Sequence, residues 1–256
     1  MQQDIVIFAP HQDDEILGAY EIIRQQPEHT YVVFLTNGDY EGAEVAKTRW
    51  HESRKALTHL GVPEDHMIAL GYADTGMPRE VSFLWRLWHE GDQTLVSSHV
   101  GAHTYHPDGG KEYHLAHWGA HAAYIRLAVL ADVRGVLEDI RPGTIYVTNE
   151  DDVHGDHAAA PLFVRAAIDQ IADYTPTIYR YHVHGGDDER WPNRTGDVFE
   201  KPLNLDESQW ESRVSVPVED QKDFLETLES FQSQWRDAEY MTAFIKKEQI
   251  FYREKK

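Results

Sequence analysis

Short apolar runs recur along the first part of the chain and alternate with segments of helical character. Asp4–Ala9, Tyr31–Leu35 and Met67–Leu70 are largely apolar, as expected for strands buried on both faces of a parallel sheet. Glu15–Gln26 and Glu44–Leu60, which separate these runs, are predicted to be helices. This β-α-β-α-β order predicts right-handed crossover connections and a Rossmann-like sheet.

The same alternation returns in the middle of the chain. A helix is predicted from Trp118 to Ile140, a buried strand over Thr144–Thr148, a helix over Ala158–Ala172 and a strand over Thr177–Val183. We therefore predict an α/β fold of three layers, with a mostly parallel sheet and helices on both faces.

Three segments depart from this rhythm. Residues 73–113 mix aromatic side chains with loop-forming residues, which predicts a helix, then a long loop that serves as a lid or assembly surface. A polar loop over 185–194 precedes a weak strand around 203–205. A last helix is predicted from the 3.6-residue spacing of Phe224, Leu225, Leu228, Phe231 and Trp235. Without an internal repeat or a long linker, we expect residues 1–256 to form one domain.

Composition narrows the classes of function. The formal charge of −20, from 44 acidic and 24 basic residues, argues against binding to nucleic acid or anionic lipid. No apolar run approaches the roughly 18 residues of a membrane span, and the N-terminus lacks the basic start of a signal peptide, so we expect a cytoplasmic protein. Because cysteine is absent, any metal must be held by His, Asp or Glu. Oligomeric state stays open, with a homo-oligomer among the alternatives.

Two clusters of metal-binding side chains follow strands. His11, Asp13 and Asp14 come after the first strand, and His154 and His157 come after the fourth. Ligands bind at the carboxyl ends of the strands in such sheets, so both clusters are expected at one edge. His11 and Asp14 are three residues apart and can aim at one point, which leaves Asp13 for acid–base work. Imidazoles and a carboxylate suit zinc, and a catalytic zinc takes three protein ligands and a water.

Simpler roles exist for each residue alone. Asp13 or Asp14 can cap a helix N-terminus, and acidic residues there also interact favourably with the helix dipole. His154 or His157 alone is more often a solvated or hydrogen-bonded imidazole. The two clusters together, each at a strand end, favour a metal site. Glu15 is interpreted as structural, or as a residue that orients a ligating histidine.

These motifs resemble those of the LmbE/PIG-L family of zinc-dependent N-deacetylases. The family's His-Pro-Asp-Asp-Glu stands here as the sequence His-Gln-Asp-Asp-Glu over 11–15, with Gln12 in place of proline, and its His-x-Asp-His is intact over 154–157. Weaker matches are Thr-Asn-Gly-Asp over 36–39, the Arg49-x-x-Glu52 pattern, residues 72–77 and Ser233-Gln234. The resemblance covers roughly residues 4–74 and 138–172.

The resemblance implies a role for each residue of the two main motifs. His11, Asp14 and His157 would bind zinc, or another divalent ion such as Fe²⁺. Asp13 would be the general base, and His154 would stabilise the oxyanion or act as an acid. The implied reaction removes an acetyl group from an N-acetylglucosamine-type sugar or its conjugate, a small-molecule substrate.

Arg49, Asp74 and, less clearly, Asp39 resemble family positions that contact sugar hydroxyls. A surface ion pair for Arg49 and a turn cap for Asp74 are equally good interpretations. Two other functions compete with deacetylation. A metallophosphoesterase would need more carboxylates and more positive charge around the phosphate. A sugar- or nucleotide-binding Rossmann-like domain without catalysis would not require Asp13 and His154, and the chain lacks G-x-G-x-x-G after its first strand.

Overall fold

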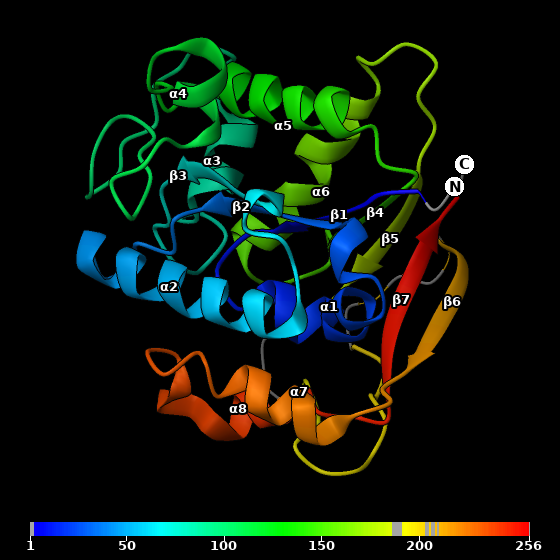
Figure 1. Cartoon of the computed structure of the whole chain (residues 1–256). Coiled ribbons are helices and arrows are strands. Elements are labelled where there is room, and N and C mark those ends of the chain that lie inside the picture. The colour runs from blue at the N-terminus through cyan, green and yellow to red at the C-terminus, as the bar shows by residue number, and fades with distance from the viewer. Residues whose placement is uncertain (1–2, 186–190, 203–204, 206–207, 209, 256) are drawn as a thin grey trace.

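A seven-stranded sheet forms the centre of the molecule (Figure 1). The computed structural model describes residues 3–185, 191–202, 205, 208 and 210–255. The strand order is β3-β2-β1-β4-β5-β7-β6. The parallel strands are β1 (Ile5–Ala9), β2 (Thr30–Thr36), β3 (Met67–Tyr72), β4 (Thr144–Thr148) and β5 (Thr177–Tyr181). Antiparallel to β5 runs β7 (Glu248–Glu254), which pairs with β6 (Trp210–Pro217).

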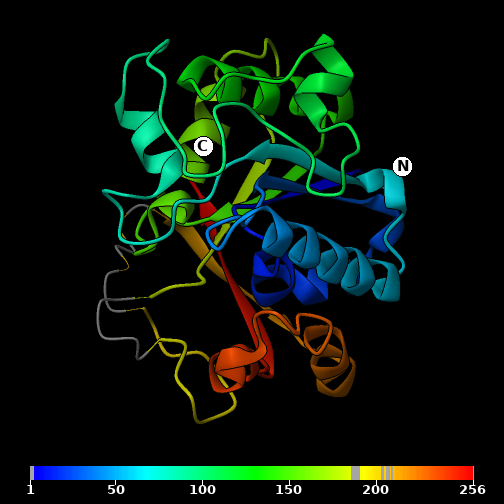
Figure 2. The ribbon, with the colours of Figure 1, turned by 90° about the vertical axis from the view of Figure 1, so that its left-hand side faces the viewer.

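Helices cover both faces of the sheet, which confirms the predicted fold class. Because side chains alternate along a strand, Val6 and Phe8 of β1 join one core, and Ile5 and Ile7 join the other. The first face carries α3 (Phe83–His89), α4 (Tyr113–Trp118), α5 (Arg126–Ile140) and α6 (Gly155–Ile168). The second carries α1 (Asp14–Gln25) and α2 (Ala43–Leu60), with α7 (Gln221–Leu228) and α8 (Ala238–Thr242) beyond them (Figure 2).

Three single-turn 3₁₀ helices complete the described elements. They are η1 (Pro27–His29), η2 (Glu64–His66) and η4 (Trp235–Asp237). None of the described helices has the length and apolar character needed to cross a membrane.

The connectivity explains where a site can form. From β1 the chain builds outward through β2 to β3 and then returns to place β4 on the other side of β1. The loops that leave β1 and β4 therefore diverge to opposite faces and open a crevice at the carboxyl edge, where open α/β sheets bind ligands. Both predicted metal-binding motifs lie where these two loops enter α1 and α6.

Some boundaries differ from the predictions. The helix predicted over Trp118–Ile140 begins only at Arg126, as α5. Trp118 is instead the last residue of α4, which Gly119 ends at a φ of 84°. The last predicted helix stops at Leu228. Phe231 lies beyond its end, and Trp235 begins η4. Strands β6 and β7 were not predicted. Residues 203 and 204 of the predicted weak strand and residues 186–190 of the polar loop fall outside the described residues.

Residues 73–113 are built into the fold more than the sequence suggested. Phe83, Leu84 and Leu87 of α3 are fully buried in the core that α3 shares with α6. Figure 2 shows this segment on the face that α5 and α6 cover, away from α7 and α8. A role as a lid or assembly surface stays a prediction.

Candidate metal centre and active site

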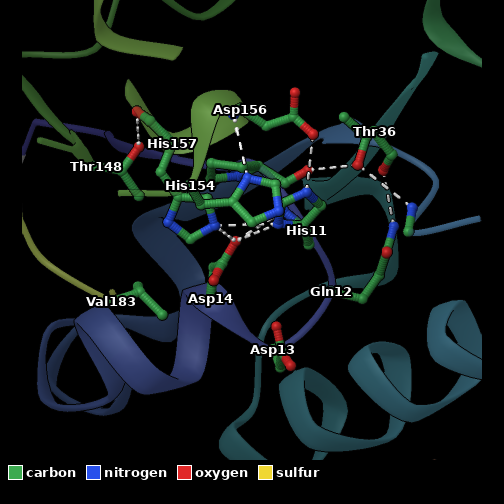
Figure 3. Close-up of polar contacts among 12 residues, drawn as sticks. His11, Gln12, Asp13, Asp14, Thr36, Thr148, His154, Asp156, His157 and Val183 are labelled. Atoms are coloured by element: carbon green, nitrogen blue, oxygen red, sulfur yellow. Dashed lines mark hydrogen bonds and ion pairs between the residues drawn. The ribbon is translucent and has the colours of Figure 1, made fainter. Parts of the chain in front are cut away.

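The three predicted metal ligands meet at the carboxyl edge of the sheet (Figure 3). His11 lies in the turn after β1, Asp14 begins α1, and His157 lies in the first turn of α6. His11 Nδ1 is 3.1 Å from His157 Nε2 and 3.3 Å from Asp14 Oδ2, and the latter two atoms are 3.1 Å apart. The structure therefore brings the three donor atoms into one small, buried triangle.

The size and chemistry of this triangle fit a zinc ion. Ligand atoms about 2.0–2.1 Å from a tetrahedral zinc lie roughly 3.3 Å from one another. Two imidazole nitrogens and a carboxylate oxygen form a common catalytic ligand set, which leaves a fourth position for water. Donor atoms of His11, His154 and His157 also lie within 4.8 Å of one another, and a second such group joins His11 and His154 with Asp74 and Asp156.

A buried carboxylate orients each of the two imidazoles from its far side. His157 Nδ1 lies 3.2 Å from Asp152 Oδ2, and His11 Nε2 lies 3.1 Å from Asp156 Oδ2. An ionised carboxylate only accepts, so each ring donates from that nitrogen and leaves the facing nitrogen to bind a metal. Sequence reasoning assigned no role to Asp152 or Asp156, although both stand within the second cluster.

The centre favours positive charge. Burial alone would lower the pKa of His157, but Asp14 and Asp152 raise it to about 9. Burial likewise opposes the ionisation of Asp14, yet His157 and His11 hold its pKa well below the usual value. A site that stabilises protons on imidazole in this way also attracts a cation, which displaces those protons when it binds.

Asp152 also fixes the loops around the centre. Its Oδ2 accepts from the backbone N–H groups of Val183 and His184, at 3.1 and 2.9 Å, and its Oδ1 accepts from that of His154 at 3.0 Å. The carboxylate thereby joins the end of β5 to the turn that carries the second motif.

Asp13 lies apart from the triangle and towards α2 (Figure 3). Its backbone has a φ of 116°, which is strained for a residue with a side chain, and its N–H donates to Glu15 Oε2 at 2.8 Å. Glu15 also accepts from Ser53 at 2.7 Å, so it holds the Asp13 peptide and contacts no ligating histidine. Burial raises the pKa of Asp13 to about 7, although Arg49, 3.3 Å away, lowers it.

His154 caps the N-terminus of α6 and faces the cavity. Its Nδ1 accepts from the backbone N–H of Asp156 at 3.2 Å, so a neutral ring carries its proton on Nε2. Burial and the neighbouring His11 and His157 lower the pKa of His154 well below its ordinary value. The side chain is thus a neutral hydrogen-bond donor.

The three predicted substrate contacts are placed differently from one another. Arg49 and Asp74 line the cavity, and Arg49 also donates to the Gln12 carbonyl at 2.7 Å. Asp39 lies behind them, where its oxygens accept from the Asp74 N–H at 2.6 Å and the Tyr105 hydroxyl at 2.8 Å. Asp39 is not among the described residues that line the cavity.

The cavity has a volume of about 270 Å³, and much of its wall comes from late in the chain. Besides the residues above, it is lined by Leu17, Met77, Val183, His184, Gln234, Asp237, Tyr240 and Met241. Sequence reasoning missed this wall, apart from noting Ser233-Gln234 as a motif.

Two of the weaker motifs meet in the structure. Glu52 of α2 accepts from the Ser233 N–H at 2.7 Å and from its hydroxyl at 2.6 Å. Gln234, the next residue, lines the cavity. The Arg49-x-x-Glu52 pattern thus contributes Arg49 to the cavity and anchors the C-terminal wall through Glu52.

An α/β fold that brings two imidazoles and a carboxylate together beside a second carboxylate and an oriented imidazole donor is typical of hydrolases that use a metal. Comparison with family models gives the narrower assignment. Residues 6–168 match the model described as PIG-L, GlcNAc-PI de-N-acetylase. The chain belongs to the PIG-L family, and this membership supports a hydrolytic N-deacetylase.

Solved structures share the fold at low sequence identity. The zinc-inhibited form of teicoplanin deacetylase Orf2 is 14% identical, with a TM-score of 0.59 over 98% of this chain and 97% of that one. N,N'-diacetylchitobiose deacetylase from Pyrococcus horikoshii is also 14% identical, with a TM-score of 0.57 over 98% and 83%.

A third neighbour has a different activity. GalB, the 4-carboxy-2-hydroxymuconate hydratase from Pseudomonas putida KT2440, is 11% identical, with a TM-score of 0.56 over 99% and 95%. The fold therefore does not determine the reaction. A search of curated protein sequences finds no significant match.

Proposed function

We propose that this protein is a zinc-dependent hydrolase that removes the acetyl group from an N-acetylglucosamine-type amino sugar or its conjugate. The observation that carries the proposal is the triangle of His11, Asp14 and His157 atoms, in a chain that belongs to the PIG-L family. These three residues would hold the metal. When bound, it would polarise the amide carbonyl and activate a water molecule.

The remaining residues supply the proton transfers and the charge stabilisation. Asp13 lines the same cavity and, as general base, accepts the proton of the attacking water. His154 presents its Nε2–H to the negative charge that develops on the carbonyl oxygen, where one fixed donor is typically worth about 3 kcal/mol. Arg49 and Asp74 contact the sugar hydroxyls, and Asp39 positions Asp74 through the bond to its backbone N–H.

The charge around the cavity disfavours the phosphoesterase alternative. Among the described residues that line it, Arg49 is the one lysine or arginine, and it is paired with Asp13. A phosphate group would meet several carboxylates and little positive charge. Binding without catalysis would not require the partly exposed Asp13, whose strained backbone places its carboxylate in the wall of the cavity.

Acetate release from a panel of N-acetylated amino sugars, with and without a chelator, tests the proposal. We expect release that the chelator stops and added zinc restores. Asp13→Asn should keep zinc and lose at least about a hundredfold in kcat, the usual contribution of a general base. The exposed Asp169→Asn is the matched control and should behave as wild type. Chelator-resistant release, or full turnover by Asp13→Asn, would contradict the proposal.

A further inference from the structure

A second histidine lines the cavity with its hydrogen-bonding direction fixed. His184 follows β5, and its Nδ1 lies 3.0 Å from the Tyr240 hydroxyl, which donates to the Val183 carbonyl at 2.7 Å. A carbonyl oxygen only accepts, and a tyrosine hydroxyl has one proton, so that proton is committed to Val183. The hydroxyl must then accept from His184, which places the proton of the neutral imidazole on Nδ1.

His184 Nε2 is therefore a bare acceptor in the neutral ring. No described residue forms a hydrogen bond with this nitrogen. His154 has the opposite arrangement, because its Nδ1 accepts from the Asp156 N–H and its Nε2 carries the proton. One wall of the cavity thus carries a donor imidazole and an acceptor imidazole next to each other.

The spacing of the two rings suits a single planar group. Their centroids are 5.7 Å apart and their planes differ by 30°. The His184 ring is also 4.9 Å from that of the ligand His157, so it lies beside the metal centre. A secondary amide is planar and, in its usual trans form, carries its carbonyl oxygen and its N–H on opposite edges. An amide that lies between the two Nε2 atoms therefore turns its oxygen to the donor imidazole and its N–H to the acceptor imidazole.

We propose that His184 Nε2 accepts a hydrogen bond from the N–H of the substrate's acetamido group, while His154 serves the carbonyl oxygen, so that the site selects amides over esters. This inference rests on the proposed function and adds the recognition of the amide nitrogen. Tyr240 is a positioning residue, because it acts through the His184 proton. An ester would instead place oxygen lone pairs against the bare nitrogen, which is repulsive.

Nitrogen NMR of the imidazole rings tests the premise without substrate or metal. In ¹⁵N-labelled, chelated protein, we expect His184 with a protonated Nδ1 and a bare Nε2, and His154 with the reverse pattern. Tyr240→Phe should remove the preference of His184 for this tautomer. A proton on His184 Nε2 in the wild-type protein would overturn the inference, whatever the enzymatic activity.

Kinetics on a matched pair of substrates tests the selectivity. The probes are methyl N-acetylglucosaminide and the corresponding methyl glucoside acetylated at the 2-hydroxyl, and the measured quantity is the ratio of their kcat/KM values. His184→Phe should lower this amide-to-ester ratio about tenfold, the usual effect of one hydrogen bond. His184→Gln, which supplies an acceptor oxygen, should restore part of it.

The control is the nearby buried His182, whose replacement in His182→Phe should leave the ratio unchanged. An unchanged ratio in His184→Phe would mean that His184 contacts another part of the sugar, which overturns the inference but leaves deacetylation intact. Absence of acetate release from both probes by the wild-type enzyme would instead count against the proposed function, and the NMR experiment would still decide the inference.

Discussion

Gly155 lies against Ser82, and its backbone N–H donates to the Ser82 hydroxyl at 3.1 Å. A Cβ added to Gly155 would lie 2.5 Å from Ser82 Cβ and 2.8 Å from Arg79 Cα, well inside van der Waals contact. Gly155 is the variable second residue of the His-x-Asp-His motif. In this structure only glycine fits at that position without a shift of Ser82 or Arg79.

Gly155→Ala is expected to destabilise the fold by about 1–3 kcal/mol, the usual cost of overpacking a rigid site. It should also weaken zinc binding, because the clash displaces the start of α6 that carries His157. Urea unfolding of the chelated protein measures the first effect. Gly101→Ala is the control, since its Cβ would meet nothing within 4 Å. Equal stability of both variants would refute this packing argument.

Asp152→Asn is expected to weaken zinc binding about 10- to 100-fold, because the asparagine cannot orient His157 as a carboxylate does. A competition titration against a fluorescent zinc chelator gives the affinity. Asp169→Asn, on the surface, should bind zinc as the wild type does. If the Asp152 variant melts at a lower temperature but keeps full affinity, the residue only supports the loops.

Ser233→Ala is expected to cost about 1–3 kcal/mol of stability, since it leaves an oxygen of the largely buried Glu52 without its partner. It should also raise KM more than it lowers kcat, because the loosened segment carries Gln234 and the cavity wall beyond it. Unfolding and steady-state kinetics measure the two effects. Ser212→Ala, on the exposed side of β6, is the control, and a change confined to kcat would disagree with this role.

His182 should make the fold sensitive to mild acid. Burial lowers its pKa to about 4, whereas an unfolded histidine titrates near 6.5. Between these two pH values the unfolded chain binds a proton that the folded protein does not. The free energy of unfolding is therefore unaffected by this histidine above pH 6.5 and decreases as the pH falls below it. At pH 5 this effect lowers the free energy of unfolding by about 2 kcal/mol.

The comparison variant is His182→Phe, which should lose less stability than wild type between pH 8 and pH 5, by about that amount. Denaturant unfolding of the chelated proteins at both pH values measures it. The exposed His89→Gln should keep the wild-type dependence. An identical pH dependence in His182→Phe would show that other groups cause the acid sensitivity.

The parallel part of the sheet could be predicted because its strands are buried on both faces and read as apolar runs. Strands β6 and β7 could not, because neither reads as an apolar run: β6 has no buried residue, and the buried positions of β7 include the polar Gln249 and Glu254. Trp210–Pro217 is mostly exposed, so its pattern carries little apolar signal. The turn after Leu228 was also missed, since apolar spacing continues past the end of α7.

The meeting of His11, Asp14 and His157 could be predicted because these residues lie in segments that follow two strands sharing an edge. The roles of Asp152 and Asp156 could also have been predicted, because both carboxylates stand close in sequence to His154 and His157. His184 and Tyr240 were not, because their contact depends on how the C-terminal segment folds back over β5. That arrangement is tertiary and leaves no local pattern in the sequence.

The zinc content of three purified proteins after dialysis tests the central claim most directly. Wild type should hold about one zinc per chain. His157→Ala should lose it, and His154→Ala, which changes an imidazole in the same cavity that is not assigned as a ligand, should retain it. Retention by His157→Ala, or loss by His154→Ala alone, would contradict a centre made of His11, Asp14 and His157.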